Sequence, residues 1–185
     1  MKPLIQILLI LLCHITLAQP NTVWFEEVVD ENDNSIHGVK QILQDREGFI
    51  WLCYRDAIGK FDGYNFKHYS RKELVTSSFK SNAPSLVFED KKQNLWIVTD
   101  AGALMQYLPD VDRFQVLNDT TRRIEGSAYS FAEDDHGNFW IGSTGGGLYK
   151  VNLKNGVFKN YRTQSKDTTT INNDFVTALT FDNKK

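Results

Sequence analysis

Residues 39–51 read VKQILQDREGFIW, residues 84–96 read PSLVFEDKKQNLW, and residues 128–140 read AYSFAEDDHGNFW. Each segment carries an Asp six residues before a Trp, and the three Trp are spaced 45 and 44 residues apart. A fourth copy begins at Val176 as VTALTFDNKK. A period of about 44 residues is typical of a four-stranded propeller blade. The sequence therefore predicts an all-β fold, a β-propeller of four-stranded antiparallel blades.

Each repeat divides into four short runs that are rich in aromatic and β-branched residues and are separated by Gly, Asp and Asn. Such runs predict antiparallel strands joined by turns. In the first repeat they begin at Val39, Phe49, Ile58 and Phe66, and corresponding runs follow in the other two repeats. Helical repeats of similar length would show an apolar period of about 3.6 residues, which these segments lack.

The repeat boundaries divide the chain into units. We expect a signal peptide at 1–18, the closing outer strand of the last blade with its link at 19–38, blade 1 at 39–82, blade 2 at 83–127, blade 3 at 128–175, and the first strand of blade 4, truncated, at 176–185. The closing strand, VWFEEV at 23–28, would remove an open sheet edge by pairing in the last blade. Since the other strands of that blade are missing, we expect an incomplete propeller of about three blades plus flanking strands, from a truncated reading frame or gene fragment.

The N-terminus has the pattern of a secretory signal peptide. Lys2 precedes the apolar run 4–13, and Thr16-Leu17-Ala18 provides a cleavage site after Ala18. The apolar run is shorter than the roughly 20 residues that a membrane-spanning helix needs, and an uncleaved anchor is the alternative. Cleavage would leave Cys53 as the single cysteine, which we expect to be a buried apolar residue rather than a reactive thiol.

Composition excludes several classes of protein. The chain is 41% hydrophobic and 12% aromatic, which argues against a disordered segment. Its 21 Lys and Arg against 23 Asp and Glu give a formal charge of -2. Without a cluster of Lys and Arg there is no electrostatic footprint for phosphate neutralisation, so we expect no nucleic-acid partner for this segment.

The Asp-x-x-Gly turn between the first two strands has a mechanical explanation. The Asp carboxylate can accept hydrogen bonds from amides of its own turn, and the Gly can adopt a positive φ. In the second repeat Gln93 replaces the Gly, and we expect the adjacent Asn94 to take the left-handed conformation there. The following Trp can pack between neighbouring sheets. We therefore assign a structural role to the repeat residues Asp45, Gly48, Trp51, Asp90, Trp96, Asp134, Gly137 and Trp140.

These motifs, together with FDGYNFKHY at 61–69 and WIGSTGGGLYKV at 140–151, resemble the two-component regulator propeller repeats of bacterial hybrid histidine kinases. The resemblance extends over roughly Trp24 to Lys185. Sialidase Asp boxes and WD repeats are less similar, because the first has Asp-x-Gly ahead of its Trp and the second has Trp-Asp at a strand end.

The resemblance implies the N-terminal periplasmic sensor region of a two-component signal transduction phosphorelay. It implies an oligosaccharide ligand and a parent protein that is a dimeric histidine kinase anchored in the inner membrane. The kinase core itself has no counterpart in this sequence, so we expect no catalysis by this fragment. The working hypothesis is a ligand-sensing propeller; a secreted propeller enzyme and a carbohydrate-binding or scaffold propeller are the alternatives.

Ligands of propellers usually meet the face where strand two connects to strand three and strand four to the next blade. Sugar recognition needs planar or bidentate polar groups, which the loops expected there supply. Solvated loop charges without a role are the alternative. The candidate ligand-binding residues are Arg55, Asp56, Asp100, Thr144 and Arg122.

We predict no cofactor and no metal. Gly145 to Gly147 could be mistaken for a phosphate cradle, but such a loop must open a helix, and the residues that follow continue as a strand. Asp30 with Asp33, and Asp134 with Asp135 and His136, lack the ligand count and spacing of a calcium loop.

Overall fold

A computed structural model of the chain describes residues 27–30, 34–55, 57–74, 79, 83–165 and 167–182. The predicted signal peptide, most of the predicted closing strand and the candidate Asp56 lie outside the described residues.

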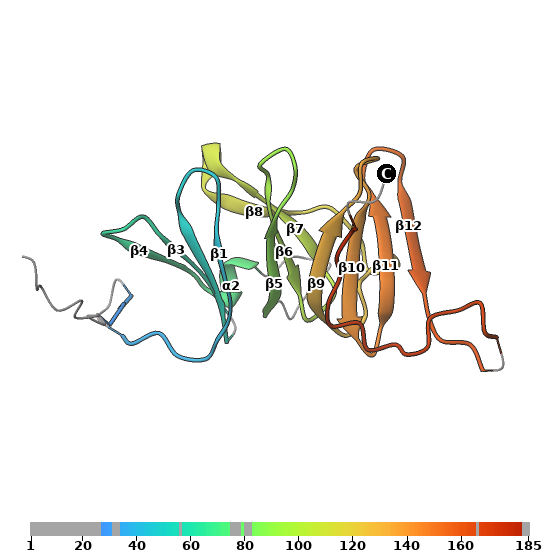
Figure 1. Cartoon of the computed structure of the whole chain (residues 1–185). Coiled ribbons are helices and arrows are strands. Elements are labelled where there is room, and N and C mark those ends of the chain that lie inside the picture. Colours follow the sequence, from blue (N-terminus) through green and yellow to red (C-terminus); the bar gives the residue numbers. More distant parts are fainter. Residues whose placement is uncertain are drawn as a thin grey trace, which may run out of the picture.

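Three four-stranded antiparallel sheets follow one another along the chain, and in each the strand order is the chain order (Figure 1). Blade 1 contains β1 (Val39–Gln44), β2 (Ile50–Tyr54), β3 (Ala57–Phe61) and β4 (Phe66–Tyr69). Blade 2 contains β5 (Pro84–Glu89), β6 (Leu95–Thr99), β7 (Leu104–Leu108) and β8 (Arg113–Val116). Blade 3 contains β9 (Ser127–Glu133), β10 (Phe139–Thr144), β11 (Gly147–Asn152) and β12 (Val157–Tyr161). The short helices α2 (Arg71–Leu74) and η1 (Pro109–Val111) lie in connections.

The blades pack face to face, and each junction has its own apolar core. Between blades 1 and 2, Trp51, Ile58 and Val87 are fully buried in one cluster. The side chain of Gln41 adds a polar link, because its amide donates to Val87 O and its oxygen accepts from Val87 N, both at 2.8 Å. Cys53 lies in the same core, where burial raises the pKa of its thiol to about 11, consistent with an unreactive, packed residue.

The repeated Asp and Trp are bonded to each other in every blade. The indole Nε1–H of the Trp donates to one carboxylate oxygen of the Asp at 2.7, 3.0 and 3.0 Å in blades 1, 2 and 3. The other oxygen accepts the backbone N–H four residues after the Asp. One carboxylate thus closes the turn and fixes the Trp that fills the junction. The hydrogen bonds between the Asp and its own turn were expected from the sequence, whereas the hydrogen bond from the indole was not.

The expectation for the second turn was wrong in one detail. Gln93 itself has the positive φ, 69°, at the position of Gly48 and Gly137. Asn94 instead uses its backbone and side-chain N–H groups to bond Asp90. The physical reason is that the turn fixes which position must be left-handed, so residue preference at the neighbouring position cannot move it.

Residues 176–182, expected as the first strand of a fourth blade, form no strand in the structure. A single bridge joins Thr144 and Phe175, and the N–H of Val176 donates to Ser143 O at 2.9 Å. The segment therefore only begins to cover the free face of blade 3. At the other end, Val29 and Ser35 form an isolated bridge.

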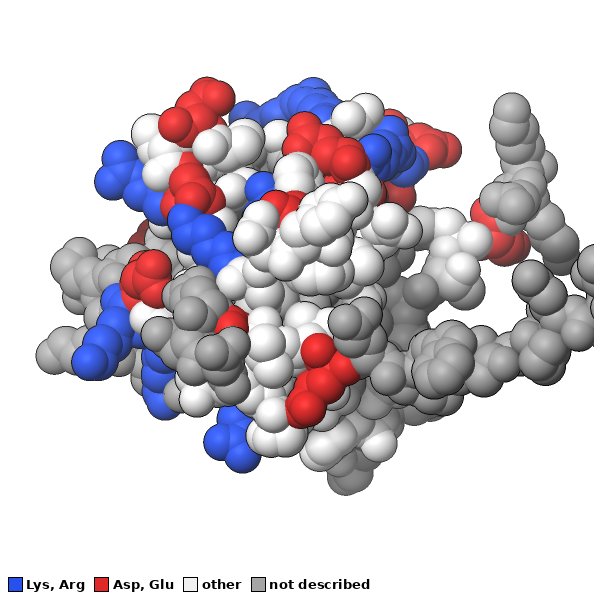
Figure 2. Space-filling view, turned by 90° about the vertical axis from the view of Figure 1, so that its left-hand side faces the viewer, with Lys and Arg blue, Asp and Glu red and all other residues white. Residues whose placement is uncertain are grey.

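Blade 1 has an outer face with no neighbouring sheet among the described residues. Ile42 is 64% exposed there, although the corresponding residue of blade 2, Val87, is fully buried. Tyr54 and Phe66 form a small apolar cluster on the same side. Figure 2 shows this side of the molecule, with uncharged residues across its centre and charged side chains mostly around them.

Candidate functional site

The connections from strand two to three and from strand four to the next blade emerge at one end of the blades, opposite the Asp turns. In Figure 1 this end is the lower edge of blade 3. The predicted ligand-binding residues are distributed over this end, with Arg55 on blade 1, Asp100 and Arg122 on blade 2, and Thr144 on blade 3. Among the described residues no hydrogen bond or ion pair joins any two of them, and each is bonded within its own part of the blades.

Arg55 has an exposed side chain and a backbone held at a φ of 39°. Its N–H donates to Gly38 O at 3.3 Å, and its carbonyl accepts from Lys40 Nζ at 3.0 Å. The same ammonium group donates to Pro84 O at 3.3 Å. Lys40 therefore fixes the Arg55 loop against blade 2 and leaves the guanidinium at the surface.

Asp100 has a structural bond of its own. Its Oδ1 accepts from Ala83 N at 3.0 Å, and its backbone N–H donates to Ala83 O at 2.8 Å. The carboxylate thereby anchors the residue just before β5. An exposed side chain in this position can still offer its second oxygen to a ligand hydroxyl.

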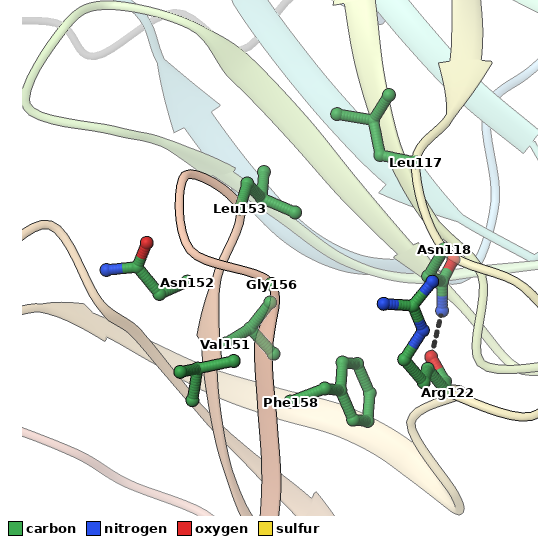
Figure 3. Close-up of a pocket in the computed structure, with 9 residues that line it drawn as sticks. Leu117, Asn118, Arg122, Val151, Asn152, Leu153, Gly156 and Phe158 are labelled. Carbon is green, nitrogen blue, oxygen red and sulfur yellow. Dashed lines mark hydrogen bonds between the residues drawn. The ribbon is translucent and has the colours of Figure 1, made fainter.

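Arg122 is paired within its own loop. Its Nη2 lies 3.0 Å from Asp119 Oδ2, and hydrogen bonds from Thr121 and Arg122 lower the pKa of Asp119. The carbonyl of Arg122 accepts from Asn118 Nδ2 at 2.8 Å (Figure 3). The residue lines a cavity of about 90 Å³ together with Leu117 and Phe158. An exposed pair of this kind costs little to rearrange, so the guanidinium is available to a ligand.

A polar network beside Thr144 escaped the sequence interpretation. Arg162 donates to Gly145 O at 2.8 Å and forms ion pairs with Glu125 at 3.0 Å and Asp174 at 3.2 Å. It brings together three connections of blade 3. The available signal was that Arg162 and Asp174 delimit the long link after the last strand, but their contact depends on how that link folds back.

The triple glycine serves close packing. A Cβ on Gly146 would collide with the carbonyl oxygen of Glu125, and β11 begins at Gly147. Gly145 and Gly147 both donate their N–H groups to Asp174 O. The run therefore fits two loops together and, as the sequence indicates, opens a strand.

Among the described residues, no group of three or more His, Cys, Asp or Glu could hold a metal ion. The described part of the chain likewise contains no helix with the length and hydrophobicity that a membrane span requires.

Residues 123–145 match the family described as "Two component regulator propeller". This segment contains β9, the Asp turn and the Trp strand β10 of blade 3. The chain thus carries a repeat of that family, which confirms the resemblance drawn from its motifs. No curated protein matches the sequence.

Solved structures share the fold. The extracellular domain of a B. thetaiotaomicron system, described both as one-component and as hybrid two-component, is 20% identical with a TM-score of 0.64, covering 78% of this chain and 19% of that one. A second hybrid two-component extracellular domain from this organism is 24% identical with a TM-score of 0.55, covering 69% and 18%. Virginiamycin B lyase from Staphylococcus aureus is 14% identical with a TM-score of 0.56, covering 80% and 48%. The chain therefore spans about a fifth of the length of the first two, and the predicted propeller fold is confirmed.

Proposed function

We propose that this chain, which carries a two-component regulator propeller repeat, is the ligand-sensing part of a two-component signalling system and has no catalytic role of its own. The observation that carries the proposal is the family match within blade 3, on a fold shared with extracellular domains of such systems. The predicted signal peptide supports a periplasmic location. A membrane-anchored, dimeric histidine kinase as the parent protein belongs to the same proposal.

The ligand is an oligosaccharide, bound at the end of the blades that carries Arg55, Asp100, Arg122 and Thr144. Asp56 belongs to the proposal as a candidate from the sequence alone. Exposed guanidinium and carboxylate groups at this end supply the bidentate donors and acceptors that sugar hydroxyls require. The network of Arg162, Glu125 and Asp174 adds a preorganised charged group beside Thr144. Signalling follows if the ligand binds one receptor arrangement more tightly than another.

A glycan-binding screen of the full chain, followed by calorimetry on the best ligand, tests this proposal. We expect Arg55→Ala and Arg162→Ala each to weaken binding by about tenfold, because each removes a charge-assisted hydrogen bond. Arg46→Ala is the matched control, since Arg46 is an exposed residue in the turn at the opposite end, 3.8 Å from Glu89. Loss of binding in the control as well, or no glycan bound by the wild type, would reject the proposed face.

A secreted propeller enzyme is the second candidate, favoured by the likeness to virginiamycin B lyase. Incubation of the full chain with polysaccharides separates the two. New reducing ends or unsaturated products would establish the enzyme and remove the sensor proposal; unchanged polysaccharide with retained glycan binding would support the sensor.

A further inference from the structure

A cavity of about 480 Å³ lies between blades 1 and 2 at the end that carries the Asp turns, opposite the end that carries the candidate ligand-binding residues. Its volume is within the range of small-molecule sites. Aromatic rings, two lysines, two carboxylates and an amide line it: Phe49, Lys60, Asp62, Asn65, Lys67, Tyr69, Tyr107, Pro109 and Asp112. We call it the Lys60–Lys67 pocket.

Asp112 holds the two blades together at this pocket. Its Oδ1 accepts from Tyr69 Oη at 2.5 Å and Tyr107 Oη at 2.6 Å, and its Oδ2 accepts from Lys67 Nζ. Burial alone would raise the pKa of Asp112, but the hydrogen bonds from Lys67 and the two phenols lower it to about 2. The carboxylate is therefore ionised and its oxygens are already engaged.

The backbone at Asp112 departs from what the repeat uses elsewhere. Asp112 is left-handed, with a φ of 50°, whereas blade 3 has Gly156 at the corresponding place in its β11–β12 turn, with a φ of 71°. A positive φ strains the backbone of a residue that carries a side chain, although Asp tolerates this conformation better than most residues. Such strain persists where the surroundings enforce it, and it is concentrated at functional sites.

Hydrogen-bond donors are in surplus in this pocket. Lys60 Nζ lies 3.8 Å from the centre of the Phe49 ring and 3.5 Å from Tyr107 Oη, and it forms no ion pair with a described carboxylate. Both oxygens of Asp62 are engaged by its own turn, through the backbone of Tyr64 and Asn65 and the Asn65 side chain. Each ammonium group carries three N–H donors, so Lys60 and Lys67 both retain the capacity to bond a further acceptor.

The junction of blades 2 and 3 shows that blade packing does not require this arrangement. The cross-strand pair Lys60 and Lys67 of blade 1 is replaced there by Gln106 and Gln115. This junction has Leu117 and Val151 at the positions that the two phenols occupy in the first junction. The cavity that Leu117 and Val151 line has a volume of only about 90 Å³ (Figure 3). A neighbouring cavity of about 280 Å³ is lined by Gln106 and Leu117, among others. Two lysines, two phenols and a shared carboxylate meet only at the first of the two described junctions.

Blade 3 also carries a pair of lysines at the positions of Lys60 and Lys67. Lys150 and Lys159 form a cross-strand pair, with Lys150 Nζ 5.1 Å from the Trp140 ring and Lys159 Nζ 4.6 Å from the Tyr161 ring. Tyr161 supplies one phenol beside this pair, but among the described residues no phenol from an adjoining blade and no counterpart of Asp112 faces it. The lysines alone are thus a feature of the blade, and the second half of the pocket comes from blade 2.

We propose that the Lys60–Lys67 pocket binds a small molecule that consists of a ring with a carboxylate group attached. The carboxylate lies between the ammonium groups of Lys60 and Lys67, and the ring lies against Phe49 and Tyr107. Charge-assisted bonds fix the anion, and the aromatic faces contribute apolar burial. The site is distinct from the proposed glycan face, because it lies at the other end of the blades.

Calorimetry on the full chain with benzoate and glucuronate tests the pocket, with benzamide and glucose as the uncharged counterparts. The double variant Lys60→Gln/Lys67→Gln introduces the residues that blade 2 already carries at these positions, so the strand pairing is preserved. Lys150→Gln/Lys159→Gln makes the same change in charge on blade 3 and is the matched control. We expect at least one of the two carboxylates to bind the wild type and the control, and to bind the pocket variant about tenfold or more weakly.

Absence of binding by both carboxylates, or equal binding by the neutral counterparts, would overturn the proposal. Equal loss in the two double variants would also overturn it, since it would show attraction to net charge alone. Inorganic sulfate competing as effectively as the ring-bearing anions would reject the role assigned to Phe49 and Tyr107. Thermal unfolding of each variant, measured alongside, identifies a variant that has lost its fold; single Lys60→Gln then gives the decisive binding measurement, because Lys60 has no ion pair to lose.

Discussion

The indole N–H of Trp51 donates to the carboxylate of Asp45 across 2.7 Å, and the same bond recurs between the Asp and the Trp of the next two blades. The Trp follows the Asp by six positions each time. The bond explains why the spacing between Asp and Trp is constant while the residues between them vary: the carboxylate must reach both its own turn and the ring that fills the blade junction.

Asp45→Ala should therefore lower the free energy of unfolding by about 2–3 kcal/mol, because it leaves the buried Trp51 N–H unpaired and opens the turn. Urea unfolding followed by tryptophan fluorescence measures the change. Asp135→Ala is the control; its side chain is 97% exposed and pairs only with Lys91, so we expect a loss below about 1 kcal/mol. Equal losses in the two variants would contradict the role of the Asp-to-Trp bond.

The second turn predicts a stabilising substitution. Gln93 has a φ of 69°, which costs an L-residue about 1–2 kcal/mol, whereas Gly adopts it freely at an entropic cost of about 0.5–1 kcal/mol. Gln93→Gly should raise the free energy of unfolding by about 0.5–1 kcal/mol. The reciprocal change, Gly137→Gln at a φ of 71°, should lower it by a similar amount. If both variants changed the free energy of unfolding in the same direction, the role assigned to the positive φ would be refuted.

Local repetition is what made the fold predictable. The spacing of Asp45 and Trp51, and its recurrence, determines turns and strand order within a blade, and those features depend on residues close in sequence. The bonds of Asp112 to Lys67 and Tyr69 join residues more than 40 positions apart. They depend on how two blades pack, and no local pattern encodes that. For the same reason the contacts of Arg162 were missed. The left-handed conformation was assigned to Asn94 instead of Gln93 for a local reason, because the turn itself fixes which position must be left-handed.

The junction between blades 1 and 2 should lose stability at acidic pH. The pKa of Asp112 is about 2 in the folded protein against an ordinary value of 3.8, so its bonds contribute stability above about pH 4 that is lost as the pH falls through 2. At neutral pH Asp112→Asn should be less stable than the wild type, and the difference should shrink between pH 4 and pH 2. Chemical unfolding at a series of pH values measures it. Asp110→Asn, in the same connection, makes the same charge change without losing the bonds to Tyr69 and Tyr107. A difference for Asp112→Asn that is independent of pH would contradict this assignment.

The free face of blade 1 should drive self-association. Ile42 is 64% exposed, and the same repeat position in blade 2, Val87, is fully buried against blade 1. Uncharged residues extend across the centre of this side of the molecule (Figure 2). Exposed apolar sheet faces invite association, so the full chain should form oligomers or aggregates whose mass rises with concentration. Ile42→Asp should shift sedimentation velocity profiles toward monomer with little change in the free energy of unfolding, because Ile42 packs little in the folded chain. Val87→Asp, the same change at the buried counterpart, should instead unfold the protein, since it places an unpaired charge in the junction core. A wild-type chain that sediments as a single monomeric species, or an Ile42→Asp profile identical to that of an associating wild type, would show that this face is not an association surface.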